Sequence, residues 1–223
     1  MIEATAVADA LGRLRDRVAA AGGGDELVVV AVTKGFGADA VTAALAAGCS
    51  HIGENYAQEL LAKRDALGHA AVHFIGQLQR NKVRALVGVV DLYETVDRDS
   101  LASEIARRDP GARVLIQVNA TDEPRKGGCH PTAVASLVEG CTSRGLRVEG
   151  LMTVGPTEGG PRAAATPFRL VRRLADELGL QTCSMGMSDD LEVAIAEGST
   201  EIRVGTSLFG ARPSLHRERR GLD

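Results

Sequence analysis

Aromatic residues are scarce in this chain of 223 residues, which has no tryptophan, two tyrosines and four phenylalanines. Proteins that hold single-stranded nucleic acid stack its bases on aromatic side chains, and this sequence has too few for such a surface. An excess of one charge is also lacking, because 26 basic and 29 acidic residues give a formal net charge of -3 at pH 7. Clustered positive charge is what binds a nucleic-acid backbone. We therefore expect no nucleic-acid partner.

The few cysteines form neither a metal-binding motif nor a disulfide pattern. They are Cys49, Cys129, Cys141 and Cys183. No pair is separated by two residues and no histidine stands at ligand spacing, so a zinc site is not indicated. Scattered thiols are typical of a reducing compartment. We expect free cysteines and no metal.

Long hydrophobic runs are missing as well. The longest, Leu27 to Val32, is far shorter than the roughly 18 residues of a membrane-spanning helix. The segment from Met1 to Arg17 is rich in charged residues and lacks the apolar core of a signal peptide. We expect a cytoplasmic protein with no membrane partner.

The N-terminal segment combines a helical pattern with a strand. Apolar residues recur with the period of one helix face at Val7, Leu11, Leu14 and Val18. This predicts an amphipathic helix over the first twenty residues, ended by the glycines at 22–24. The continuous apolar run that follows, Leu27 to Val32, is typical of a parallel strand that is covered on both faces.

Strand-like runs alternate with helical patterns along the rest of the chain. With the first, the predicted strands are Leu27–Val32, Ser50–Gly53, Val72–Ile75, Val89–Tyr93, Val114–Asn119, Val148–Val154, Leu180–Met185 and Glu201–Val204. Helices are expected at Ala38–Ala47, Asn55–Leu67, Arg98–Arg108, Thr132–Arg144, Phe168–Leu178 and Asp189–Glu197. Alternation of this kind indicates a parallel sheet, and the number of strands favours a closed (β/α)8 TIM barrel with an extra N-terminal helix.

The alternative architecture is an open, doubly wound sheet. The strand between Leu86 and Tyr93 has the weakest pattern of the set. The strands and helices leave no room for a second domain, so we expect one domain over 1–223, with its core at about 26–212 and a flexible tail at 213–223.

Lys34 stands at the carboxyl end of the first predicted strand, where a barrel places its functional side chains. A lysine that is partly desolvated there would favour its neutral amine, which attacks an aldehyde to form a Schiff base. The alternative is a lysine whose ammonium simply reaches solvent past the strand end.

Two segments near the C-terminus could bind a phosphate. Arg203 to Ser207 follows the last strand and contains Gly205 and Thr206, and Ser188 stands at the start of a predicted helix. Loops after the seventh and eighth strands of barrels commonly bind phosphate with a helix N-terminus. Each segment also has an ordinary structural explanation. Gly205 to Ser207 could be a strand-to-helix turn with an N-cap, and Ser188 or Asp189 could cap the helix that follows it.

Further polar residues lie near the ends of the other strands. Glu54 and Asn55 either line a pocket or begin a helix, and His73 within an apolar strand favours a hydrogen-bonded core histidine over a catalytic base. Lys126 and the pair Met152-Thr153 complete a candidate ring at the carboxyl ends of the strands.

Six blocks together resemble one known family. They are Val30–Lys34, His51–Glu59, His73–Lys82, Gly150–Thr153, Ser184–Asp190 and Gly198–Arg212. In this order they are similar to the pyridoxal phosphate homeostasis protein family, whose members are single-domain relatives of the alanine racemase N-terminal barrel. The glycines around Phe36 and the Gly-rich segment Gly155–Thr166 depart from the family pattern and leave the pocket rim less defined.

The resemblance implies that Lys34 carries pyridoxal 5'-phosphate as a Schiff base. It also implies that Ser188, Gly205 and Thr206 hold the phosphate, that Arg203 faces the pyridine nitrogen and that Asn55 lies near the cofactor. An arginine beside that nitrogen disfavours its protonation and makes the cofactor a poorer electron sink. Such a site suits holding the aldehyde more than stabilising a carbanion.

Three functions compete on this sequence. The first is a non-catalytic carrier that keeps free pyridoxal phosphate low and supplies apo-enzymes, working as a monomer. The second is an amino acid racemase or weak transaminase, although the resembled racemases take a catalytic tyrosine from a second domain that this sequence does not show. The third is a barrel enzyme that forms a Schiff base with a sugar phosphate and uses no cofactor. The resemblance favours the carrier, with no catalytic residue assigned.

Overall fold

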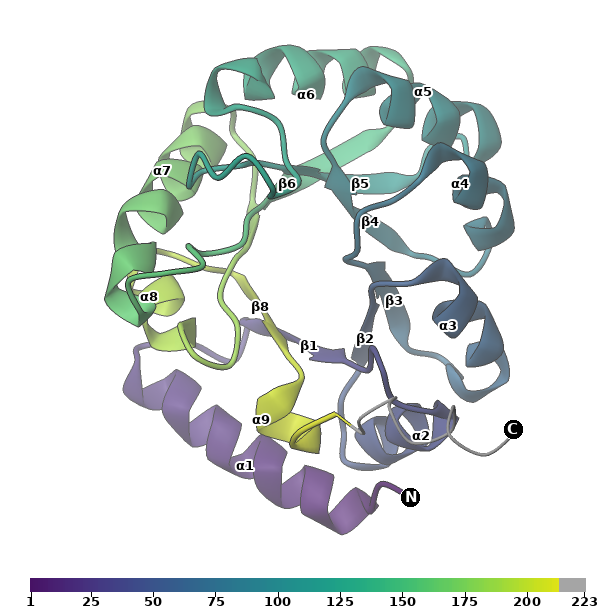
Figure 1. Cartoon of the computed structure of the whole chain (residues 1–223), viewed down its shortest axis with the longest axis vertical. Coiled ribbons are helices and arrows are strands. Elements are labelled where there is room, and N and C mark those ends of the chain that lie inside the picture. The colour runs from purple at the N-terminus through teal and green to yellow at the C-terminus, as the bar shows by residue number, and fades with distance from the viewer. Residues whose placement is uncertain (213–223) are drawn as a thin grey trace, which may run out of the picture.

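The computed structural model describes residues 1–212, and a closed barrel of eight parallel strands forms its centre. The strands are β1 (Val28–Val32), β2 (His51–Glu54), β3 (Ala71–Phe74), β4 (Leu92–Val96), β5 (Arg113–Gln117), β6 (Arg147–Met152), β7 (Thr182–Ser184) and β8 (Glu201–Val204). Each strand pairs with the next, and β8 pairs with β1 from Val28↔Glu201 to Ala31↔Val204 (Figure 1). The predicted TIM barrel is confirmed, and the alternative of an open sheet is wrong.

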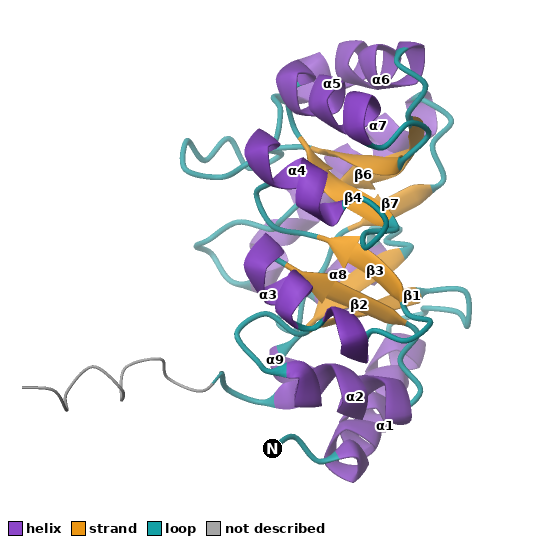
Figure 2. Ribbon diagram, turned by 90° about the vertical axis from the view of Figure 1, so that its right-hand side faces the viewer, coloured by secondary structure: helices purple, strands orange, loops and turns teal. Residues whose placement is uncertain are grey.

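Helices surround the strands on the outside of the barrel, as Figure 2 shows. They are α1 (Ala4–Ala20), α2 (Ala38–Ala46), α3 (Ala57–Ala62), α4 (Arg80–Leu86), α5 (Asp99–Arg108), α6 (Val134–Ser143), α7 (Ala165–Glu177), α8 (Leu191–Ala196) and α9 (Thr206–Phe209). Short 3-10 helices lie at Arg64–Ala66, Pro131–Ala133 and Pro161–Ala164. The helices cover the outer face of the closed sheet and the ring encloses its inner face, so the strands are buried on both sides.

Helix α1 is the predicted extra helix at the N-terminus. Its buried face consists of Val7, Ala10, Leu11, Leu14 and Val18, which includes the four residues that gave the sequence pattern. The helix lies outside the ring against α2 and α9 (Figure 1), and so covers the side of the barrel where β8 meets β1. It ends before Gly22, whose φ of 89° lies in the left-handed region that favours glycine.

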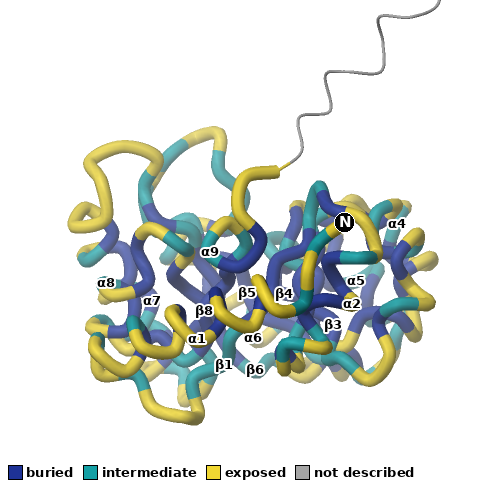
Figure 3. The backbone as a smooth tube through the Cα atoms, turned by 90° about the horizontal axis from the view of Figure 1, so that it is seen from below, coloured by how far each residue is buried: buried dark blue, intermediate teal, exposed yellow. Residues whose placement is uncertain are grey.

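The hydrophobic core runs between the barrel wall and the helices. Figure 3 shows buried backbone inside the molecule and exposed backbone along its outer surface. Large side chains that are fully buried include Phe74, Tyr93 and Phe168. Within residues 1–212, no helix has both the length and the apolar composition needed to cross a membrane.

The fourth strand begins later than the sequence indicated. The expected range was Val89–Tyr93, but β4 spans Leu92–Val96 because the unpredicted helix α4 ends in a turn there. In this turn the N–H groups of Val89 and Val90 both donate to the carbonyl oxygen of Leu86. Other boundaries differ by a few residues, as is common where helix ends fray. The tail predicted at 213–223 lies outside the described residues.

Candidate functional site

The residues singled out in the sequence meet at one cavity at the carboxyl ends of the strands. A cavity of about 270 Å³ is lined by Lys34, Asn55, Ser188, Arg203, Gly205 and Thr206 together with apolar side chains. These residues follow β1, β2, β7 and β8 or belong to β8. The barrel therefore brings together six side chains or backbone segments that are up to 172 residues apart in the sequence, from Lys34 to Thr206.

Lys34 is half-buried in the turn between β1 and α2. Burial, followed by the positive charges of Arg212 and Arg203, lowers the pKa of Lys34 below its usual value. Glu54 and Glu59 act in the opposite direction but do not outweigh these effects. Within the part of the chain that the structure describes, Lys34 forms no ion pair. The side chain is therefore more easily deprotonated to the nucleophilic amine than an ordinary surface lysine.

A buried ion pair supports the backbone on either side of Lys34. The Lys63 ammonium, at the end of α3, donates to Glu54 Oε1 at 2.5 Å and to the carbonyl oxygen of Thr33 at 2.8 Å. Thr33 Oγ1 donates to the same carboxylate oxygen at 2.5 Å. On the other side of Lys34, the N–H of Gly35 donates to Glu59 Oε2 at 2.7 Å. These contacts fix the residues before and after the lysine.

Sequence reasoning identified this support only in part. Glu54 was expected either in the pocket or at a helix start, but it is fully buried beneath the Lys34 turn and does not line the cavity. Lys63 was not singled out. The available signal was its position four residues after Glu59, the spacing at which a helical Glu and Lys face each other.

Arg203 lies on the inner face of β8 and is nearly inaccessible to solvent, with 4% of its surface exposed. One guanidinium nitrogen donates to Ser184 Oγ at 2.5 Å and the other to the carbonyl oxygen of Thr153 at 2.6 Å. A carboxylate oxygen of Glu94 lies 3.9 Å from the first nitrogen. The guanidinium is thus held rigidly at the floor of the cavity.

Asn55 lines the cavity directly after β2, and its Oδ1 is buried with no hydrogen-bond partner. A buried acceptor without a donor is costly, and such an atom calls for an explanation. Gly76 permits this placement, because a Cβ atom there would lie 1.9 Å from the Asn55 carbonyl oxygen.

Ser188, Gly205 and Thr206 form another part of the cavity lining, which we call the Ser188 wall. Ser188 Oγ accepts a hydrogen bond from the N–H of Ser207 at 3.2 Å, which joins the loop after β7 to the first turn of α9. The N–H groups at the start of a helix have no partner within that helix. The expectation that Ser188 or Asp189 caps the next helix is wrong, because α8 begins only at Leu191 and Asp190 precedes it without a side-chain cap.

The remaining candidates lie apart from Lys34. His73 is a buried core histidine, as expected, with Nδ1 2.6 Å from Glu94 Oε1. The Lys126 ammonium donates hydrogen bonds to Glu123 Oε1 at 2.7 Å and to the carbonyl oxygen of Gly155. Thr153 Oγ1 donates to the carbonyl oxygen of Val118, and Thr153 does not line the cavity, whereas its neighbours Met152 and Val154 do.

Comparison with known proteins identifies the family. The family described as "Alanine racemase, N-terminal domain" matches residues 2–213. A curated relative from Pseudomonas aeruginosa, named pyridoxal phosphate homeostasis protein, is 42% identical over 217 residues, which cover 92% of this chain and 94% of the relative.

Solved structures agree with this match. An unknown protein from Bifidobacterium adolescentis is 34% identical with a TM-score of 0.86, over 92% of this chain and 95% of that one. PipY of Synechococcus elongatus PCC7942, in a structure with PLP bound, is 32% identical with a TM-score of 0.82, over 92% of this chain and 100% of that one. The chain therefore belongs to the pyridoxal phosphate homeostasis protein family, whose barrel is that of the alanine racemase N-terminal domain.

Proposed function

We propose that this protein binds pyridoxal 5'-phosphate reversibly through Lys34 and takes part in controlling the free cofactor inside the cell. The observation that carries the proposal is that Lys34, Arg203 and Ser188 line the same cavity. PipY, a relative of the same fold and length, has been solved with PLP bound. The name of the Pseudomonas relative supports the homeostatic role.

The residues present fit the cofactor group by group. Pyridoxal phosphate supplies an aldehyde that combines with a primary amine, and Lys34 offers an amine whose pKa is lowered by burial and nearby arginines. Ser188, with the backbone of Gly205 and Thr206 at the start of α9, provides donors suited to a phosphate. The unpartnered Oδ1 of Asn55 is available to a donor on the ligand.

Arg203 favours a carrier over a catalyst of carbanion chemistry. Its guanidinium would face the pyridine nitrogen, and a positive charge there disfavours protonation of the ring. An unprotonated ring withdraws electrons less strongly, so this side chain holds the cofactor without promoting proton removal from an amino acid.

The cavity also lacks a matched pair of groups for racemisation. Among the described residues that line it, the ionisable side chains besides Lys34 are Arg203, Arg212 and Asp189. Asp189 is exposed beside Ser188, at the wall that we assign to the phosphate. Tyr93 is buried and donates to Asp109 at 3.2 Å, and Tyr56 is exposed at the start of α3. We therefore assign no catalytic residue.

The experiment that tests this function is absorbance spectroscopy of the protein with added pyridoxal phosphate, followed by borohydride reduction and peptide mapping. We expect a new absorbance band and a pyridoxyl group on Lys34. In Lys34→Ala the covalent adduct should be lost, while weak phosphate binding is retained. A spectrum that is only that of free pyridoxal phosphate, or a reduced adduct on another residue, would contradict the assignment, and the first result would favour the cofactor-free barrel enzyme.

A second measurement separates the carrier from the racemase and the weak transaminase. The loaded protein is incubated with L-alanine, and the optical purity and keto-acid content of the solution are followed. We expect neither to change at a rate above that of free pyridoxal phosphate. Delivery to clients is tested by whether the loaded protein restores an apo-enzyme that depends on the cofactor. A monomer located in the cytoplasm is part of the same proposal.

A further inference from the structure

Beneath the cavity, the barrel interior contains a buried polar cluster that the proposed function does not use directly. It consists of His73 on β3, Glu94 on β4, Ser184 on β7, and Glu201 and Arg203 on β8. Each of these residues exposes 4% of its surface or less. Charged groups so deep in a protein are stable only when each is paired and hydrogen-bonded.

The directions of the hydrogen bonds determine the charge of Glu94. Arg203 has only donors, so Ser184 Oγ accepts from it and must give its own proton to Glu94 Oε2, 2.6 Å away. The other oxygen, Oε1, lies 2.6 Å from His73 Nδ1. With His73 Nδ1 as the donor, both oxygens of Glu94 accept, which is the pattern of an ionised carboxylate. Burial raises the pKa of Glu94, whereas the charge of Arg203 and the hydrogen bond from Ser184 act in the opposite direction and favour the ionised form.

The two histidines are assigned as neutral. With its proton on Nδ1, His73 donates to Glu94, and its Nε2 then accepts from His51 Nδ1, 2.9 Å away. Burial lowers the pKa of both His73 and His51, which agrees with neutral rings. The other charges near this pair are Asp91 and Arg113, and Arg113 is held by Glu149 at 2.5 Å.

Glu201 differs from Glu94 in its contacts. Its Oε1 is buried with no partner, and its Oε2 lies 3.7 Å from His73 Nδ1, which is already engaged. If Glu201 were ionised as well, the buried cluster would contain two carboxylates and one guanidinium away from water. Burial, followed by the charge of Glu94, raises the pKa of Glu201 to about 8.

We propose that Glu94 is a positioning residue that orients Arg203 through Ser184, and that Glu201 beside it is held as a neutral carboxylic acid. The barrel interior then contains one cation, Arg203, balanced by one anion, Glu94. This inference rests on the proposed function, because Arg203 is the residue assigned to the cofactor ring. In this arrangement Glu94 on β4 keeps the guanidinium of Arg203 on β8 in a fixed orientation.

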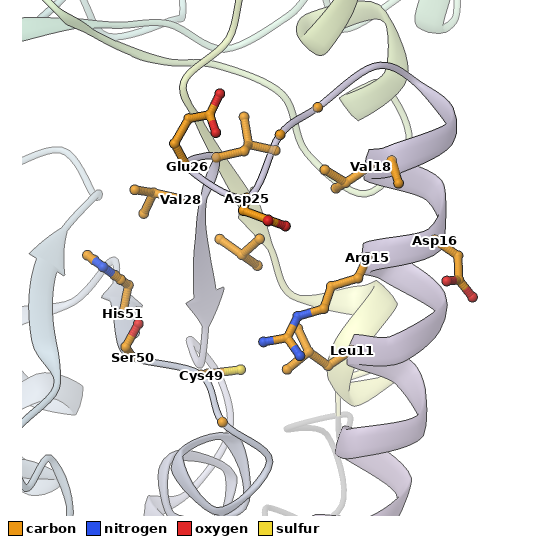
Figure 4. A pocket seen from close by; sticks show the side chains of 16 residues that line it. Leu11, Arg15, Asp16, Val18, Asp25, Glu26, Val28, Cys49, Ser50 and His51 are labelled. Atoms are coloured by element: carbon orange, nitrogen blue, oxygen red, sulfur yellow. The ribbon is translucent and has the colours of Figure 1, made fainter.

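His51 gives the cluster a connection to solvent at the far end of the barrel. It is half-buried and lines a second cavity, of about 480 Å³, between α1 and the N-terminal ends of β1 and β2 (Figure 4). The His51–His73 hydrogen bond thus joins the polar cluster to this second cavity, which Lys34 does not line. The bound proton is an equilibrium property that a titration can measure.

A proton fits the cluster better than a metal ion does. His73, Glu94 and Glu201 offer ligand atoms within 4.8 Å of one another, so a cation could be placed there by distance alone. However, Arg203 is 3.9 Å from a Glu94 oxygen, and a divalent cation would be repelled by the guanidinium. A metal would also have to break the His73–Glu94 hydrogen bond.

The protonation of Glu201 is tested on the protein without cofactor. An unfolded carboxyl loses its proton near pH 4.5, whereas folded Glu201 keeps it up to about pH 8. Between these values the folded state binds one more proton than the unfolded state, so stability falls as pH rises. The unfolding constant of the wild type should increase about tenfold more per pH unit than that of Glu201→Gln, which mimics the neutral acid.

The matched control is Glu139→Gln, which removes an exposed carboxylate on α6 and should keep the wild-type slope. Equal slopes in the wild type and Glu201→Gln would overturn the proposal, as would tight uptake of Zn²⁺ that is lost in Glu201→Gln. Independently of any variant, carbon-13 spectra of glutamate-labelled wild type should show one carboxyl that titrates near pH 8. Titration of every carboxyl in the ordinary acidic range would also overturn it.

The positioning role is tested with Glu94→Gln, Ser184→Ala and the double variant. Each single change should raise the dissociation constant for pyridoxal phosphate by about tenfold, the effect of one hydrogen bond to a charged group. Because both substitutions act through Arg203, the double variant should bind pyridoxal phosphate no more weakly than the single variant with the lower affinity. Affinity for inorganic phosphate, which the Ser188 wall would bind, should not change.

Additive losses, or an equal loss of phosphate affinity, would show a general structural role and refute the positioning role. The two levels of inference also remain distinguishable. If the wild type does not bind pyridoxal phosphate, the proposed function fails, while the proton measurements on the cofactor-free protein still decide the state of Glu201.

Discussion

Replacing Lys63 with methionine tests whether a buried ion pair holds the turn that carries Lys34. Methionine keeps most of the volume of the side chain but removes the ammonium that contacts Glu54 Oε1 and the Thr33 carbonyl oxygen. The Lys63 and Glu54 side chains expose only 5% and 0% of their surface, so water cannot replace the lost cation. Breaking such a pair on one side leaves an uncompensated charge and costs about 3–5 kcal/mol.

The assay is unfolding by urea and by heat at pH 7, monitored by circular dichroism. For a chain of this size each kcal/mol shifts the midpoint temperature by about 2–4 °C, so thermal unfolding should show a fall of roughly 10 °C. The variant should also react more slowly with pyridoxal phosphate, because the carbonyl oxygen of Thr33, next to Lys34, loses the donor that holds it.

Two further variants test the cause. In Lys63→Met with Glu54→Gln, the buried charge is removed from both sides, so most of the lost stability should return. Lys82→Met removes a half-exposed lysine that takes part in no ion pair within the described residues, and it should change stability by less than about 0.5 kcal/mol. A loss below about 1 kcal/mol in Lys63→Met, or no recovery in the double variant, would refute this account of the turn.

Three other predictions follow from the site and its loops. Because burial and nearby arginines lower the pKa of Lys34, its amine should be acetylated by a small reagent with a midpoint below pH 10.5, and quantitative mass spectrometry that placed the midpoint at or above pH 10.5 would contradict this. Ser188→Ala removes the acceptor for the Ser207 N–H and should weaken phosphate binding by about tenfold in calorimetry, whereas Ser207→Ala, which keeps that N–H, should not. Lys126 and Thr157 lower the pKa of Glu123 to about 2, so its contribution to loop protection is present above about pH 4.5 and is lost as pH falls towards 2. Hydrogen exchange of the loops around Glu123 and Thr157 should therefore be faster in Glu123→Gln than in the wild type at pH 6, and a difference that persisted at pH 2 would count against the interaction.

The fold was predictable because its signal is local. A strand that is covered on both faces is a short run such as Val28–Val32, and an outer helix repeats its apolar residues with the helical period, as α1 does. Where the local signal was weak, the predicted strand lay at the wrong residues. Val89 and Val90 are as apolar as strand residues, yet they lie in the turn that ends α4, a short helix that had not been predicted.

The positions around the cavity were also accessible from sequence. Lys34, Asn55, Ser188, Arg203, Gly205 and Thr206 stand after or at the end of strands, and parallel strands in a barrel end at one rim. Their joint location follows from the strand order, and their chemical roles were implied by the family resemblance. The supporting ion pair of Lys63 and Glu54 was missed, because two charged residues give no local sign that they are buried together.

What the sequence by itself determined is thus the eight strands, most of the helices, their parallel order and the rim at which Lys34 lies. Only the tertiary structure decided which polar side chains meet inside the barrel. Ser184 and Glu94 are 90 residues apart in the chain, and their contact depends on how the strands are staggered when β8 closes onto β1. That stagger is a property of the closed ring and not of any single strand. The charge state of the interior, with Arg203 balanced by Glu94 beside a neutral Glu201, follows from this closure.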